Sequence, residues 1–240
     1  MDGESTILCP NCRQPMRAQT LERHDRGSVG VDLCFGCAGI WFDRLESVQL
    51  APHAVLQLFK EIYAHRDDAR RALAGPLHCP RCNDVLTLSQ DLSKTGPFSY
   101  YRCHQGDGRF TPFFQFLREK QFVRTLTAVE IGHVRSQVRQ IKCSQCGAPI
   151  DLEHDTRCNY CRAPISFLDA DAIEKALRVW SDSPSHHSPE AVAGALPNAS
   201  RRLLGDRIAL AGIDSGIGAT GIGPDLVAWG LRALGSLFET

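Results

Sequence analysis

The sequence predicts an α+β chain of three small β-hairpin modules separated by amphipathic helices, followed by a flexible linker and an amphipathic C-terminal tail. Eleven cysteines form five Cys-x-x-Cys pairs and one single residue, and they fall into three groups along the 240 residues. Apolar residues alternate within the groups, as in strands, and recur at helical spacing between them. Each module is too short to bury a large core, so another source of stability is required.

Bound zinc supplies that stability in proteins with this cysteine spacing. A Cys-x-x-Cys turn aims two thiolates at one point, and two such turns provide the four tetrahedral ligands of a structural Zn²⁺. Three zinc ions are therefore expected, and their removal should unfold these zinc-stabilised modules. The ligand sets are Cys9, Cys12, Cys34 and Cys37 in the first group, Cys79, Cys82 and Cys103 with one further donor in the second, and Cys143, Cys146, Cys158 and Cys161 in the third.

Disulfides and a redox dithiol are the alternatives for these cysteines. Disulfides need an oxidising compartment, whereas residues 1–8 are acidic and polar and lack the pattern of a secretory signal. A redox Cys-x-x-Cys usually occurs once and opens a helix of a βαβ unit, whereas here the motif recurs, mostly before turn residues. We therefore expect structural zinc sites in a cytoplasmic protein.

The first module, residues 1–50, is expected to be a β-hairpin closed by zinc. Residues 16–33 suit two strands joined by a turn, with apolar residues alternating up to the second cysteine pair. Beyond that pair, Asp43 and Glu46 resemble a capping box and predict the start of a helix.

The first module follows one motif: Cys-Pro-x-Cys, a hairpin, and then Cys-x-x-Cys-x-Gly-x-Trp-x-Asp. The residues that match it are Cys9, Pro10, Cys12, Cys34, Cys37, Gly39, Trp41 and Asp43. In this motif the module resembles the transcription factor IIB-type zinc fingers of bacterial proteins. The resemblance implies a zinc ribbon with four cysteine ligands and a helix after the second cysteine pair, but not a role in transcription.

The second module, residues 76–125, contains a divergent copy of the first over residues 79–125. Placing Cys103 on Cys34 puts Gly106 opposite Cys37. Because glycine has no ligand atom in its side chain, the fourth donor must be another group.

The nearest donors for this fourth position are His104 and Asp107, and a water molecule is a further alternative. Cys103 and His104 are neighbours, and neighbouring side chains point apart in an extended chain. The turn that contains Asp107 can instead fold a carboxylate back towards the sulfurs. We therefore predict Asp107 as the fourth ligand of a middle site that is weaker than the other two.

Aromatic residues follow the cysteines of both modules. Trp41 and Phe42 are expected to pack on the first hairpin. A denser cluster in the second module could stack on nucleic-acid bases. Small zinc modules need bulky apolar residues to cover their hairpins, however, so core packing is favoured. The cluster comprises Phe110, Phe113, Phe114, Phe116, Leu117 and Phe122.

The third module, residues 143–168, is the shortest. Its two halves repeat the pattern Cys-x-x-Cys-x-Ala-Pro-Ile, which makes the two cysteine pairs pseudo-symmetric. Residues 143–165 are similar to the small zinc ribbons of multi-ribbon proteins. That resemblance implies a module that carries out no chemistry and holds a surface for a partner.

Amphipathic helices are expected between the modules. Residues 51–75 contain a helix that begins at Pro52, and residues 126–142 contain one that begins with a capping box at 127–130. A short third helix is expected within residues 169–182. The apolar faces comprise Val55, Leu58, Phe59, Ile62 and Tyr63 in the first helix and Ile131, Val134, Val138 and Ile141 in the second.

The charge of the chain argues against broad nucleic-acid binding. The formal net charge is zero, but eleven zinc-bound thiolates and three Zn²⁺ would leave about minus five. Any contact with phosphate must therefore be local. The best candidate is a basic stripe of Arg135, Arg139 and Lys142 on the second connecting helix, for which an ordinary solvated face is the alternative.

The C-terminal part changes character. Residues 183–200 are typical of a flexible linker, in which the adjacent His186 and His187 are incidental. Residues 201–240 form an apolar tail with an amphipathic helix, which could bury its face against the modules, a second copy, another protein or a membrane interface. Aspartates interrupt the tail, so no transmembrane segment is expected.

These features predict a zinc-binding, non-enzymatic multi-ribbon adaptor. Closed four-cysteine sites leave no open coordination position, and no catalytic constellation emerges from the sequence. A protein partner is expected ahead of nucleic acid, with self-association through residues 201–240 as a further interaction. The alternative function is a zinc or thiol redox sensor that releases metal from the middle site, and metal-dependent hydrolysis at that site is a third.

Overall fold

The computed structural model describes residues 6–65, 68, 71–94, 96–169 and 172. The chain divides into two compact units between Glu119 and Lys120, and each unit is described by itself. The linker, the C-terminal tail and nearly all of the helix expected within 169–182 lie outside the described residues. Within the described part of the chain, no helix has the length and apolar character needed to cross a membrane.

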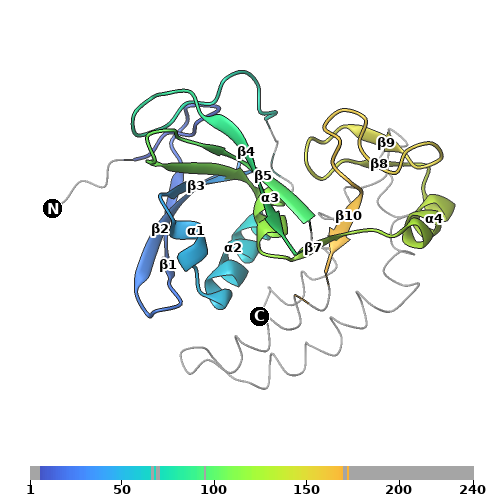
Figure 1. The fold of residues 1–240 in the computed structure, drawn as a ribbon, viewed down its shortest axis with the longest axis horizontal. Helices are drawn as coiled ribbons and strands as arrows, with labels where there is room; N and C mark the ends of the chain where they lie inside the picture. The colour runs from blue at the N-terminus through green and yellow to red at the C-terminus, as the bar shows by residue number, and fades with distance from the viewer. Residues whose placement is uncertain (1–5, 66–67, 69–70, 95, 170–171, 173–240) are drawn as a thin grey trace. The chain divides into compact units, whose positions relative to one another are not determined.

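The first unit is built on one six-stranded antiparallel sheet (Figure 1). Its strand order is β1-β2-β3-β6-β5-β4, so the third strand of the first module lies beside the third strand of the second. The strands are β1 (Arg17–Glu22), β2 (Ser28–Cys34), β3 (Gly39–Asp43), β4 (Thr87–Ser93), β5 (Gly96–Arg102) and β6 (Gly108–Pro112).

This sheet joins two modules that the sequence predicts as separate. Aligning Cys34 on Cys103 puts Trp41 on Phe110, and these two residues lie directly opposite each other in the β3–β6 register. The two modules are therefore related by a pseudo-two-fold axis that passes between Trp41 and Phe110. The sequence predicts hairpins separated by helices and does not predict this pairing, in which the open edges that the two hairpins leave at their third strands join.

Two glycines make this pairing possible. A β carbon at Gly39 would lie 2.1 Å from Cζ of Phe110, and one at Gly108 would lie 2.8 Å from Cζ2 of Trp41. The aromatic ring of each module thus occupies the space beside a glycine of the other. Because a β carbon fits at neither position, the glycine of the Cys-x-x-Cys-x-Gly motif is required by contact between the modules.

The two faces of the sheet are covered differently. On one face Phe42 lies against Phe116, with ring centroids 5.7 Å apart, and three helices pack on this side. On the other face Trp41 and Phe110 pack among the cysteines of both modules. The helices are α1 (Glu46–Gln49), α2 (Pro52–Ala64) and α3 (Phe113–Glu119).

The aromatic residues serve as core, as the sequence predicts. Trp41 and Phe42 are fully buried. In α2, the described apolar residues Val55, Leu58, Phe59 and Ile62 are also buried. The expectation of core packing rather than base stacking is confirmed for the cluster in the second module, because Phe110, Phe113, Phe114, Phe116, Leu117 and Phe122 are all at most 7% exposed.

The capping box predicted at Asp43 and Glu46 is half wrong. Glu46 does accept a hydrogen bond from the Asp43 backbone N–H, at 2.6 Å. The residue at the helix N-cap, however, is Leu45, and no side chain caps α1. The Asp43 carboxylate is engaged elsewhere, because it accepts hydrogen bonds from the indole of Trp41 and from the guanidinium of Arg81.

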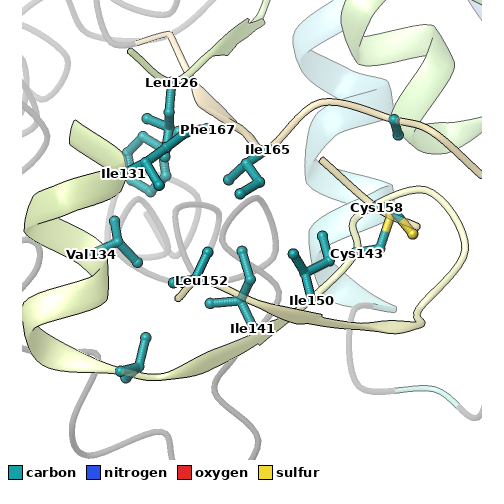
Figure 2. Close-up of a cluster of buried hydrophobic side chains, with 12 residues drawn as sticks. Leu126, Ile131, Val134, Ile141, Cys143, Ile150, Leu152, Cys158, Ile165 and Phe167 are labelled. Atoms are coloured by element: carbon teal, nitrogen blue, oxygen red, sulfur yellow. The ribbon is translucent and has the colours of Figure 1, made fainter. Parts of the chain in front are cut away.

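In its described residues, the second unit combines two small antiparallel strand pairs with one helix. β7 (Val123–Thr125) pairs with β10 (Ser166–Leu168), and β8 (Gln140–Lys142) pairs with β9 (Pro149–Asp151). Figure 2 shows apolar side chains of the helix α4 (Ala128–Gln137) pointing towards those of the strands. The buried cluster includes Ile131, Val134, Ile141, Ile150, Leu152, Ile165 and Phe167, so the helix and the cysteine module share one core.

The helix α4 starts as predicted and ends earlier than predicted. Thr127 and Glu130 form a full capping box. Val138 is extended and closes the helix, and Ile141 lies on β8, so the expectation that both lie on the helix is wrong. The physical reason is the strand pair β8–β9, which must carry the chain into Cys143.

The early end of α4 also breaks up the expected basic stripe. Arg135 lies on the helix, Arg139 follows it and Lys142 lies on β8. Arg139 is paired with two acidic residues, 3.5 Å from Asp151 and 3.2 Å from Glu153. These three basic residues therefore form no continuous helical surface.

The contact between the modules predicts that Gly39→Ala destabilises the first unit. The added methyl group overlaps the Phe110 ring, and overpacking of this kind costs about 1–3 kcal/mol. Urea denaturation monitored by circular dichroism, with zinc present, would measure the loss. Gly30→Ala is the matched control, because Gly30 also lies in a strand of this sheet but a β carbon there meets no atom within 4 Å. Equal stability of the two variants would contradict the packing described.

Candidate metal centres

Four of the cysteine pairs share one backbone turn. The first cysteine accepts a hydrogen bond from the N–H of the residue after the second cysteine and donates its own N–H to the carbonyl one residue further on. The residue directly after the second cysteine has a positive φ in each of these four pairs. This turn directs both sulfurs to the same side, as a metal site requires. The residues with positive φ are Arg13, Asn83, Gly147 and Arg162.

The structure assembles the first predicted ligand set at the sheet surface. The sulfurs of Cys9, Cys12, Cys34 and Cys37 lie within 4.8 Å of one another. Four ligands about 2.3 Å from a tetrahedral Zn²⁺ would have sulfurs about 3.8 Å apart. Cys12 Sγ and Cys34 Sγ are separated by 3.8 Å. The first set therefore has the dimensions of a closed zinc site.

The third set has the same form. Sulfur atoms of the two pairs lie 3.6 Å apart, from Cys143 to Cys161 and from Cys146 to Cys158. All four fall within the 4.8 Å limit. The repeated sequence pattern of the two halves thus corresponds to two turns that face each other.

The middle set is completed in the structure by Asp107. Its Oδ2 atom lies 3.5 Å from Cys79 Sγ and 3.4 Å from Cys103 Sγ, and Cys82 Sγ lies 3.4 Å from Cys103 Sγ. One sulfur and one carboxylate oxygen bound to the same tetrahedral zinc would be about 3.5 Å apart. The donors therefore fit zinc, and the geometry favours Asp107 among the alternatives left by the sequence.

A shift in the backbone turn brings Asp107 into this position. In the first module Ala38, the residue after Cys37, has a φ of +49°. In the second module the left-handed residue comes one position earlier, at Gly106, with a φ of +82°. Glycine adopts this conformation without strain. The turn therefore presents the side chain of the next residue to the three sulfurs.

His104 lies outside this group. Its side chain is 59% exposed, and Nε2 lies 3.8 Å from a carboxylate oxygen of Asp84 and 3.2 Å from the amide of Gln105. The structure thus places His104 away from the three cysteines. This placement does not support His104 as the alternative fourth ligand of the middle site.

The close approach of the sulfurs perturbs their acidity. Hydrogen bonding with Cys34 and burial raise the pKa of Cys9, and hydrogen bonding with Cys143 raises that of Cys161. The same contact lowers the pKa of Cys143 to about 5. Hydrogen bonds from Cys82 and Cys103 lower the pKa of Asp107, with a smaller contribution from the charge of Arg81. Asp107 is thus an anion at neutral pH, as a metal ligand must be.

Neighbouring polar groups support both sites of the first unit. The amide of Asn11 donates to Cys37 Sγ at 3.2 Å, and the backbone N–H of Arg81 donates to Cys79 Sγ at 3.4 Å. Asn11 and Arg81 occupy the same position in their cysteine pairs, but the Arg81 side chain reaches across to Asp43. Sequence reasoning missed these supports, because the residue between two cysteines carries no signal of its distant partner.

A fourth group of possible donors lies in the second unit. Asp151, Glu153 and His154 also fall within the 4.8 Å limit. The first two are the ion-pair partners of Arg139. Because acidic residues at the surface that are paired with arginine need no metal, these three residues do not indicate a further metal centre.

The comparison with known families finds a match for the segment that contains the first cysteine set. Residues 8–52 match the family model of the transcription factor zinc-finger. This zinc-finger segment spans β1 to β3 and α1 and contains the first four-cysteine set, as the resemblance seen in the sequence implies. No curated protein and no solved structure matches the chain.

The ligand chemistry predicts an order of metal release. A hard carboxylate among three thiolates holds zinc less firmly than a fourth thiolate or an imidazole, so the middle site should empty first under a chromogenic chelator. Asp107→His should slow the release of this first zinc equivalent, and Asp107→Ala should speed it. His104→Ala is the control and should change little. If His104→Ala loses the first-released zinc equivalent and Asp107→Ala retains it, the fourth ligand of the middle site is His104.

Proposed function

We propose that the protein binds three zinc ions structurally, at the two four-cysteine sets and at the set completed by Asp107. The observation that carries this proposal is the agreement between the donor separations, 3.4–3.8 Å, and the edges of a tetrahedral zinc site. The zinc-finger segment at residues 8–52 supports it for the first site.

We further propose that the metal-bound modules form a non-enzymatic adaptor for a protein partner. Three closed donor sets leave no position for a reactive water on the metal. The aromatic cluster of the second module is buried, so these rings offer no surface on which the bases of single-stranded nucleic acid could stack. Contact with nucleic acid through Arg135, Arg139 and Lys142 is accordingly the less favoured interaction.

An exposed strand edge supports the choice of a protein partner. β4 is a seven-residue edge strand of the six-stranded sheet. Its Leu88 and Leu92 share a face and are 57% and 76% exposed. An edge strand with exposed apolar side chains is a surface on which another chain can add a strand. Thiolate ligands also require reducing conditions, which agrees with a cytoplasmic location.

Release of zinc from the middle site is the second candidate function. The fourth donor of this set is a carboxylate, whereas each of the other two sets has four thiolates. This difference favours faster metal exchange at the middle site than at the other two. A zinc or thiol redox sensor would use this difference, whereas an adaptor would tolerate it.

Metal content tests the zinc proposal directly. The purified full-length protein should contain close to three zinc equivalents by elemental analysis, and intact mass should show reduced cysteines. Exhaustive chelation should unfold both units, which circular dichroism would detect. A content near one equivalent, or mostly oxidised cysteines, would contradict three structural sites.

The partner proposal predicts a selective effect at β4. Leu92→Lys should reduce recovery of host proteins on the immobilised full-length chain, because a charge replaces the exposed apolar side chain. Thr87→Lys, an exposed substitution on the other face of the same strand, is the matched control. Loss in both variants, or in neither, would count against docking through the apolar face of β4.

A further inference from the structure

The Asp43 carboxylate lies where the two modules of the first unit meet. It accepts a hydrogen bond from Trp41 Nε1 at 2.8 Å and a two-pronged interaction from Arg81, whose Nη2 lies 2.6 Å from Oδ2 and whose Nε lies 3.2 Å from Oδ1. Arg81 stands between Cys79 and Cys82, the first two donors of the middle metal set. Asp43 therefore fixes a positive charge that belongs to the other module.

The same arginine lies close to the fourth donor. Asp43, Arg44, Arg81 and Asp107 line one shallow pocket on the surface of the first unit. The backbone N–H of Arg44 donates to the Asp107 carbonyl at 3.1 Å, which holds the Asp107 turn against the end of β3. Two carboxylates and the Arg81 guanidinium thus share this pocket, and Arg81 is bonded to Asp43.

We propose that Asp43 is a positioning residue for the middle metal site: by binding Arg81 it keeps this guanidinium off Asp107 and leaves the carboxylate available to the metal. The inference rests on the proposed zinc at Cys79, Cys82, Cys103 and Asp107. A guanidinium binds a carboxylate through two charge-assisted hydrogen bonds, so a released Arg81 would compete with zinc for the same oxygen atoms. Asp43 tunes the site without touching the metal.

Asp43 is the aspartate of the Cys-x-x-Cys-x-Gly-x-Trp-x-Asp motif in the first module, and this arrangement gives it a role at the metal site of the second module. Asp43 lies in the segment that matches the zinc-finger family, yet its charge acts on a metal site outside that segment. At the corresponding place in the first module Asn11 has no charge, and it donates directly to the ligand Cys37. The first site therefore needs no such counter-charge.

Zinc release from the full-length chain tests the proposal with variants that break the same ion pair from opposite sides. Asp43→Asn keeps an oxygen for the Trp41 indole but loses the charge that holds Arg81, so the fastest-released equivalent should leave about tenfold faster. Arg81→Gln breaks the same pair but removes the competitor, so release should be no faster than in the wild type. The double variant should behave like Arg81→Gln.

The controls separate this inference from the zinc proposal itself. Asp25→Asn removes another Asp–Arg pair of the first module, with Arg23, and should leave all release rates unchanged. The two slower equivalents serve as an internal check that each variant is folded. A wild-type content below three equivalents would overturn the proposed middle site. If the wild type holds three, wild-type release in Asp43→Asn, or equally fast release in Arg81→Gln and the double variant, would overturn the role of Asp43.

Discussion

The pairing of β3 with β6 is the constraint on which the first unit depends. It places Trp41 opposite Phe110, and each ring fills the space beside a glycine of the other module. The same two rings pack among the cysteines of both metal sets. A small module gains little from its own core, so sharing one apolar layer between two metal sites gives each of them a better-packed support. The cost is that neither module can change independently of the other.

Metal geometry and protein packing reinforce each other in this arrangement. The turns that position the cysteines contain residues with positive φ, several of them not glycine. Such backbone conformations are unfavourable for most residues and persist where surrounding contacts impose them. Bound zinc would provide that constraint through four bonds per site. In the middle site the constraint is weaker, because one bond comes from the exposed turn that carries Asp107 and depends on where Arg81 is held.

Sequence reasoning reached the features that are encoded locally. The cysteine sets follow from spacing, the hairpins from alternation, and Asp107 from the turn residues beside it. The β3–β6 pairing could not be predicted with the same methods, because aligning Gly39 on Gly108 and Trp41 on Phe110 identifies equivalent positions and does not show that the two strands pair. The end of α4 was missed because Val138 and Ile141 fit a helical period as well as they fit the strand that follows. Contacts such as Asp43 with Arg81 join residues far apart in the chain, and single residue types do not reveal them.

The contact between Gly39 and Phe110 tests the shared layer most directly. In a nuclear Overhauser spectrum of the zinc-loaded protein, an α proton of Gly39 should show a strong cross-peak to Hζ of Phe110, since the space for a β carbon at Gly39 lies beside Cζ. Cross-strand peaks between Trp41 and Phe110 should accompany it. Absence of both, in a sample that holds its full metal content, would mean that the two modules fold side by side without forming one sheet.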